Sequence, residues 1–145
     1  MRNNNLGDRM KTYENVIRTL FRGKCKTDNK WLYGFPYVTR KNAVKINWYC
    51  SEFGSMRTDE VIPETVGQFT GLTDKNGVKI FEGDIVERVS VGERAVISWV
   101  KYSACFGLSF DGWCCGFDDY DFSPNDFKVI GNIHDNPEII KSANP

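Results

Sequence analysis

The stretch VGQFTGLTDKNGVKIFEGDIV, residues 66–86, decides the fold. Two short β-prone runs, Thr65–Thr70 at its start and Val78–Phe81 within it, have Asp74-Lys75-Asn76-Gly77 between them. Asn-Gly suits the positive φ angles of a type I′ turn, so the two runs are predicted to pair as a hairpin. Gly83-Asp84 predicts a second turn directly afterwards. Such frequent turns at Gly, Asn and Asp are typical of a small antiparallel β protein.

Short β-prone runs separated by turn residues continue on both sides of this stretch. Further predicted strands are Trp31–Tyr33, Ala43–Cys50, Ile85–Val91, Arg94–Lys101, Ala104–Phe110 and Phe127–Ile130. Pro36 is expected to confine its strand to a sheet edge or a bulge. About nine short strands with turns every 8–12 residues predict an all-β barrel or sandwich.

Three segments interrupt this pattern. Residues 10–21 fit a helix by spacing, whereas residues 16–25 also fit a strand ending at Gly23, and periodicity does not decide between them. Residues 51–60 are polar and are predicted to be a connector and an internal boundary, and residues 111–126 form an acidic loop. The predicted organisation is a flexible tail at 1–13, an N-terminal β subdomain at 14–60 and a barrel-like subdomain at 61–145, which together form one compact unit.

Length and composition limit the class of protein. The 145 residues are 41% hydrophobic and 26% charged, which is globular rather than disordered. No apolar run approaches the 18 residues of a membrane helix, and the N-terminus lacks the apolar core of a signal peptide. The sequence therefore predicts a cytoplasmic protein with no membrane partner.

The five cysteines are Cys25, Cys50, Cys105, Cys114 and Cys115. Their number is odd and no CxxC occurs, so reduced, partly buried thiols are expected. Neighbouring side chains on a strand point to opposite faces, which makes Cys114 and Cys115 poorly suited to chelate one zinc ion. A nucleophile pair of Cys114 or Cys115 with His134, the single histidine, has no local sequence signal of activation.

Carboxylates give no better indication of catalysis or metal binding. Asp118-Asp119-Tyr120-Asp121 lacks the alternate acidic positions and the sixth-position glycine of a calcium loop. Glu82 and Asp84 flank Gly83 in a predicted turn, so neither is assigned an acid–base role. No catalytic residue, metal or cofactor is predicted.

Three blocks of the sequence resemble the YopX family of phage and prophage proteins. They are residues 66–77 with 80–86, residues 129–138 (VIGNIHDNPE), and residues 20–24 (LFRGK) with 31–34 (WLYG). They follow the order of the family's blocks. The resemblance implies a mainly β fold with an SH3-like barrel in its C-terminal part and a phage or prophage setting, and it leaves the activity open. Residues 36–64 and 104–126 depart from the pattern.

The motif residues also have a physical interpretation without the family. Glycine supplies positive φ at turns, and Asn and Asp side chains accept hydrogen bonds from nearby backbone amides. We therefore expect structural roles for Gly67, Gly71, Asp74, Asn76, Gly77, Glu82, Gly83, Asp84, Gly131, Asn132, Asn136 and Pro137.

Charge is unevenly distributed although the formal net charge is zero. Residues 1–60 hold 12 Lys and Arg against 6 Asp and Glu, and residues 61–145 hold 7 against 13. Basic residues contact phosphates and aromatic faces stack on bases, so the first half is a candidate nucleic-acid surface. The candidate residues are Arg18, Arg22, Lys24, Lys26, Lys30, Trp31, Tyr33, Arg40, Lys41 and Lys45. The simpler interpretation is that the aromatic residues fill the core and the lysines solvate the outer faces.

These observations predict a non-enzymatic accessory or interaction protein of a phage or prophage, acting inside the infected cell on a host or phage protein. The alternative is a nucleic-acid-binding module that uses the basic, aromatic first half. Opposite charge in the two halves and exposed strand edges also predict a homo-oligomer.

Overall fold

The structure, a computed structural model, describes residues 19–141. The predicted tail at 1–13, most of the segment at 10–21 and Arg18 lie outside these residues. The chain divides into two compact units, Met1–Phe69 (unit 1) and Thr70–Pro145 (unit 2). Residue 60, the predicted end of the N-terminal subdomain, lies within unit 1, and Val61 is buried in the core of that unit.

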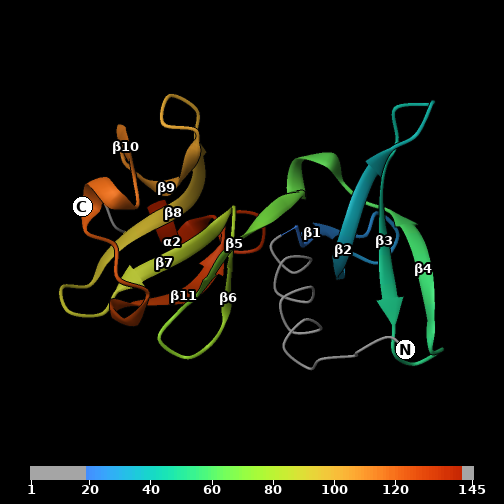
Figure 1. Cartoon of the computed structure of the whole chain (residues 1–145), viewed down its shortest axis with the longest axis horizontal. Coiled ribbons are helices and arrows are strands. Elements are labelled where there is room, and N and C mark those ends of the chain that lie inside the picture. Colours follow the sequence, from blue (N-terminus) through green and yellow to red (C-terminus); the bar gives the residue numbers. More distant parts are fainter. Residues whose placement is uncertain (1–18, 142–145) are drawn as a thin grey trace, which may run out of the picture. The chain divides into compact units, whose positions relative to one another are not determined.

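Unit 1 is an antiparallel sheet of short strands (Figure 1). Its strands are β1 (Phe21–Lys24), β2 (Trp31–Val38), β3 (Val44–Cys50) and β4 (Ser55–Glu60), in the order β4-β3-β2-β1. After β4 the chain comes back to the end of β1, where Cys25 and Val61 form an antiparallel β-bridge. A 3-10 helix, Pro63–Thr65, leads into β5 (Gly67–Thr73), whose first residues pair with β1.

The core of unit 1 follows from side-chain alternation along these strands. Leu32, Ile46, Val61 and Cys25 are buried together, with Val44, Trp48 and Val66 packed against them. Thr65 joins the 3-10 helix to β1, because its hydroxyl accepts a hydrogen bond from the Lys24 amide at 2.8 Å. The prediction that Pro36 confines its strand to a sheet edge or a bulge is wrong, because β2 lies between β1 and β3 and its register with β3 is continuous. β1 pairs only with Trp31–Gly34, so Pro36 lies beyond that pairing and its missing N–H removes no hydrogen bond from the β1–β2 ladder.

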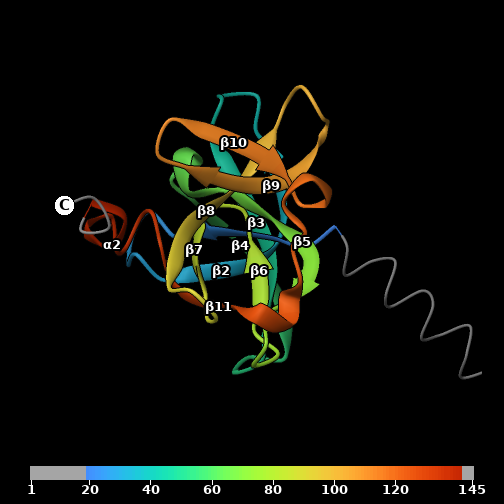
Figure 2. The ribbon, with the colours of Figure 1, turned by 90° about the vertical axis from the view of Figure 1, so that its left-hand side faces the viewer.

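Unit 2 begins with the second half of β5 and its neighbour β6 (Lys79–Phe81). A five-stranded antiparallel sheet follows in the order β10-β9-β8-β7-β11 (Figure 2). Its strands are β7 (Asp84–Arg88), β8 (Glu93–Val100), β9 (Cys105–Phe110), β10 (Trp113–Gly116) and β11 (Phe127–Asn132). Two 3-10 helices, Asp118–Tyr120 and Pro124–Asp126, connect β10 to β11, and a short helix α2 (Glu138–Lys141) ends the described chain. The core of unit 2 contains the buried residues Ile80, Val86, Ile97, Leu108 and Phe127.

The mainly β class is confirmed, whereas several details differ from the predictions. Residues 51–60 include the strand β4, and the predicted acidic loop includes the strand β10. Asn76-Gly77 does not form the predicted type I′ turn, because of these two residues only Gly77 has a positive φ. The Asp74 side chain accepts hydrogen bonds from the amides of Asn76 and Val78 in this turn. The described residues form two sheets and contain no closed barrel.

Candidate functional site

Four aromatic side chains alternate along β2 in unit 1. They are Trp31, Tyr33, Phe35 and Tyr37, and the residues between the first three, Leu32 and Gly34, are buried. Successive side chains of a strand point to opposite faces, so the four rings share the face opposite the core. Tyr33, Phe35 and Tyr37 are exposed by 48%, 43% and 47%, whereas Trp31 is partly buried. The core interpretation of the aromatic residues therefore does not apply to these three.

Neighbouring strands add polar and basic residues to the same face. Lys24 of β1 lies opposite Trp31, and Lys45 and Asn47 of β3 lie opposite Tyr37 and Phe35. Directly opposed residues of antiparallel strands share a face. By the same alternation, Tyr49 of β3 belongs to this face and is 62% exposed. We call this surface the aromatic face, defined by Arg22, Lys24, Trp31, Tyr33, Phe35, Tyr37, Lys45, Asn47 and Tyr49.

Two cations lie at the Trp31 end of the row. The Arg22 guanidinium carbon lies 4.6 Å from the centroid of the Trp31 ring, and the Lys24 Nζ lies 5.8 Å from it. Both distances are within the range of a cation–π interaction. Arg22 is only 7% exposed. It therefore packs against Trp31 and is not a surface ligand for phosphate.

The other predicted residues lie around this face. Lys26 is ion-paired with Glu60 at 2.8 Å, and this hydrogen bond raises the pKa of Lys26. Lys30 is exposed in the turn before Trp31, and Arg40 and Lys41 are exposed in the turn after β2. The structure thus brings Arg22, Lys24, Trp31, Tyr33 and Lys45 onto one sheet face and places the remaining described candidates in the turns. Phe35, Tyr37 and Tyr49 are aromatic residues of the basic first half that were not among the candidates, although alternation continued through Pro36 could have added the first two.

In unit 2, the Asp74 carboxylate connects a turn to a distant strand. Its Oδ1 accepts hydrogen bonds from the amides of Asn76 (2.8 Å) and Val78 (2.9 Å), and its Oδ2 accepts one from Val129 (2.9 Å). Burial alone would raise the pKa of Asp74, but these three donors outweigh it and hold the pKa below its ordinary value. Asp74 is therefore a structural residue that joins the β5–β6 turn to β11.

The other motif residues of unit 2 have similar roles. Asp84 is buried and accepts a hydrogen bond from the Phe81 amide at 2.7 Å. The Asn132 side chain accepts hydrogen bonds from the amides of His134 and Asp135 in the turn before Pro137. Gly131 has no space for a side chain, because a Cβ there would lie 2.7 Å from the Asn136 Oδ1. Burial raises the pKa of the half-buried Glu82. A hydrogen bond from the Trp99 amide lowers this pKa, but by less than burial raises it.

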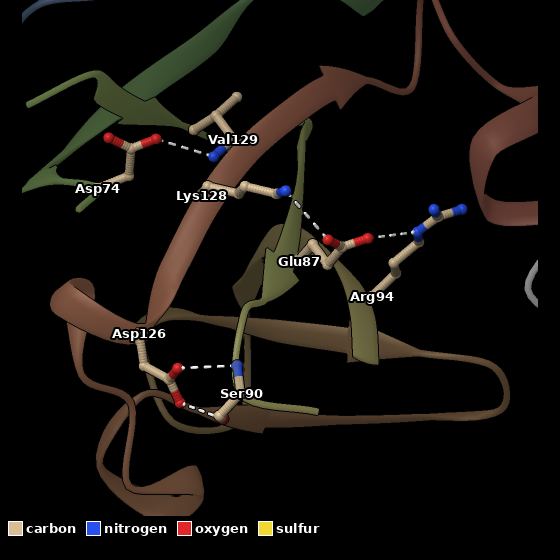
Figure 3. A network of polar contacts seen from close by, with 7 residues as sticks. All are labelled: Asp74, Glu87, Ser90, Arg94, Asp126, Lys128 and Val129. Atoms are coloured by element: carbon tan, nitrogen blue, oxygen red, sulfur yellow. Dashed lines mark hydrogen bonds and ion pairs between the residues drawn. The ribbon is translucent and has the colours of Figure 1, made fainter. Parts of the chain in front are cut away.

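Ion pairs extend this framework across β7, β8 and β11 (Figure 3). Glu87 bonds Arg94 at 3.0 Å and Lys128 at 3.3 Å, and these two cations lower its pKa. Asp126 bonds Arg88 and also holds Ser90 through the amide and the hydroxyl, contacts that lower its pKa. Both carboxylates bind side chains or backbone of neighbouring strands, so their role is structural.

Cys115 lacks the lowered pKa of an activated nucleophile. All five cysteines are free, and Cys25, Cys50 and Cys115 are buried, as expected. Burial raises the pKa of Cys115, and Asp119 raises it further, whereas a reactive cysteine needs a lowered pKa. Over residues 19–141, no group of three or more His, Cys, Asp or Glu side chains is placed to hold a metal ion.

Unit 2 also carries an open groove of about 660 Å³ between the β9–β10 hairpin and α2. Phe110 and Trp113, stacked 4.5 Å apart, form part of its lining. Arg94 and Lys141 contribute positive charge, and Glu93 and Asp111 contribute negative charge. This balance favours no charged ligand. In the described part of the chain, no helix has the length and apolar character needed to cross a membrane.

The comparisons with known proteins agree with the fold and the motif blocks. The model of the YopX protein family matches residues 20–141, and the chain therefore belongs to this family. The structure is similar to the crystal structure of protein EF1440 from Enterococcus faecalis, with a TM-score of 0.53 and 25% sequence identity. That similarity covers 83% of this chain and 96% of EF1440. Among curated proteins, none matches the chain significantly.

Proposed function

We propose that this YopX protein binds single-stranded nucleic acid through the aromatic face of unit 1 and catalyses no reaction. The observation that carries the proposal is the line of three exposed rings on one strand, Tyr33, Phe35 and Tyr37. Exposed aromatic rings beside basic side chains are the elements with which proteins hold unpaired bases and the phosphates between them.

Charge favours nucleic acid over a protein partner for this surface. Lys24 lies at the Trp31 end of the row. Lys45 lies at the Tyr37 end on the opposite side of β2, where its partner on β4 is Glu60, whose carboxylate is ion-paired with Lys26. Lys30, Arg40 and Lys41 are exposed in the turns that flank β2. A nucleic-acid strand that follows the row carries phosphates along its whole length, so cations at both ends of the row favour its binding. A protein partner of ordinary composition has no such need for cations at both ends.

The YopX family assignment supports a setting in a phage or prophage, where the protein would act in the cytoplasm of the bacterial host. Single-stranded nucleic acid arises there during replication and transcription. In this proposal the protein is an accessory factor, and the motif carboxylates and glycines of unit 2 keep their structural roles.

The test is fluorescence anisotropy with a labelled single-stranded oligonucleotide and the full chain at about 50 mM salt. We expect Tyr33→Ala, Phe35→Ala and Tyr37→Ala each to weaken binding by about 5- to 150-fold, since stacking of one base contributes about 1–3 kcal/mol. Tyr102→Ala is the matched control, because Tyr102 is a 73% exposed aromatic residue of unit 2. Circular dichroism verifies that each variant is folded.

Two results would overturn the proposal. One is a folded wild-type chain that binds no single strand at low salt. The other is binding that all three alanine variants retain at full strength. If nucleic acid fails and the same variants abolish binding to a purified protein partner, the aromatic face is a protein-docking surface instead.

A further inference from the structure

We infer that the aromatic face selects weakly stacked, pyrimidine-rich single strands by holding bases between successive rings. This inference rests on the proposed function and identifies its ligand more narrowly. Its basis is the spacing of the rings along β2.

The spacing follows from strand geometry. A β-strand rises about 3.3 Å per residue, so rings at positions i and i+2 are carried about 6.6 Å apart. Side chains stand roughly perpendicular to the sheet. Tyr33, Phe35 and Tyr37 therefore form two gaps of about 6.6 Å on the exposed face. That distance is twice the rise of about 3.4 Å between stacked bases, so each gap accepts one base in contact with a ring on either side.

A base in each gap loses its contact with the neighbouring base, because the Phe35 ring lies between them. The bound strand is therefore extended, and its own stacking has to be broken. The cost is greatest for adenine runs and least for thymine or uracil runs, since preferences of this kind arise from stacking strength and backbone flexibility. Duplex DNA cannot enter the gaps, because its bases are paired and stacked.

The groups beside the gaps are an apolar ring, an amide and an ammonium group. Phe35, which separates the gaps, has no polar atom in its ring, and the side chains opposite Phe35 and Tyr37 are Asn47 and Lys45. Lys45 suits a phosphate, as does Lys24 on the other side of β2. From Trp31 to Tyr37 the row spans about 20 Å, which limits the footprint to a few nucleotides.

The experiment compares (dT)8, (dA)8 and a hairpin whose stem is made of these two runs, each fluorescein-labelled, against the full chain in one buffer. We expect (dT)8 to bind about tenfold more tightly than (dA)8, and the hairpin to bind most weakly. Phe35→Trp keeps a ring between the gaps and should keep the preference. Phe35→Leu keeps apolar volume without a ring and should bring (dT)8 to the affinity of (dA)8.

The outcomes separate this inference from the proposed function. If neither single strand binds, the proposed function fails. A second outcome is that both single strands bind, that their binding depends on Tyr33 and Tyr37, and that (dA)8 binds at least as tightly as (dT)8. The proposed function then stands and the inference is wrong. Equal preference in the Phe35→Leu and Phe35→Trp variants would also contradict it, because the ring at position 35 would then have no role in selection.

Discussion

At the scale of single residues, Asp74 shows how one carboxylate joins segments far apart in the sequence. Its two oxygens accept hydrogen bonds from three backbone amides, one of them 55 residues away. Asparagine offers a single oxygen at this position, and its NH2 group would face an amide donor. We expect Asp74→Asn to lower the free energy of unfolding of unit 2 by about 2–3 kcal/mol, the range for hydrogen bonds to charged groups.

Urea unfolding followed by the NMR signals of β7 and β11 measures this loss. Asp121→Asn is the control, because Asp121 is exposed in the same unit and has a left-handed backbone conformation that asparagine tolerates. A loss of equal size in both variants would contradict the role assigned to Asp74.

Asp74 also predicts a pH dependence. Its folded pKa is lower than its ordinary value of 3.8, so ionised Asp74 stabilises the folded state. That contribution is fully present above the ordinary pKa and is lost as the pH falls through the folded pKa. Between pH 5 and pH 2, unit 2 of the wild type should therefore lose more stability than unit 2 of Asp74→Asn. Parallel losses in the two proteins would show that Asp74 does not contribute.

At the scale of elements, β2 carries both the core and the binding surface of unit 1, so its register matters for both. Gly34 is buried opposite Trp48, and a Cβ there would fall on the backbone carbonyl of Asn47. Backbone cannot move aside without breaking the β2–β3 ladder. We expect Gly34→Ala to destabilise unit 1 by about 3 kcal/mol or more and to abolish nucleic-acid binding.

The matched variant is Gly54→Ala. Gly54 lies in the exposed β3–β4 turn with open space around it, although its φ of +61° makes alanine there mildly strained. Thermal unfolding monitored by the NMR signals of β2 and β3 distinguishes the two variants. A Gly34→Ala protein as stable as Gly54→Ala would show that the register of β2 and β3 is wrong.

Elements also show what the sequence could predict. Strands with a buried face, such as β3 and β8, were predicted nearly in full because apolar residues alternate along them. β4 was predicted as a connector because its sequence, SMRTDE, is polar. In the structure most of its residues are exposed. It is a strand because β3 supplies its backbone hydrogen bonds, together with the bond from the Trp48 indole to Asp59 at 2.7 Å. The short strand β10 depends in the same way on β9.

The aromatic face was predicted only in part for a related reason. Composition indicated a basic, aromatic first half, but composition does not tell which rings are buried. Trp48 packs against the core, whereas Tyr33, Phe35 and Tyr37 are exposed. That difference depends on which face of β2 meets Ile46 and Val61, and only the pairing of the strands decides it.

At the scale of the whole molecule, the zero net charge is a cancellation between the two units. Unit 1 holds 12 Lys and Arg against 7 Asp and Glu, and unit 2 holds 7 against 12. Binding confined to unit 1 should weaken steeply with salt. If about four phosphates are contacted, the slope of log K against log salt is about −3. Lys45→Gln should flatten the slope by about 0.7, whereas Lys101→Gln in unit 2 should leave it unchanged.

The most direct test of the central claim is an NMR titration of the 15N-labelled full chain with (dT)8. We predict chemical-shift changes concentrated in residues 22–24, 31–37 and 45–49, with the signals of β7 to β11 unchanged. Changes centred on unit 2, or no changes in folded protein at millimolar oligonucleotide, would contradict the assignment of the aromatic face as a nucleic-acid-binding surface.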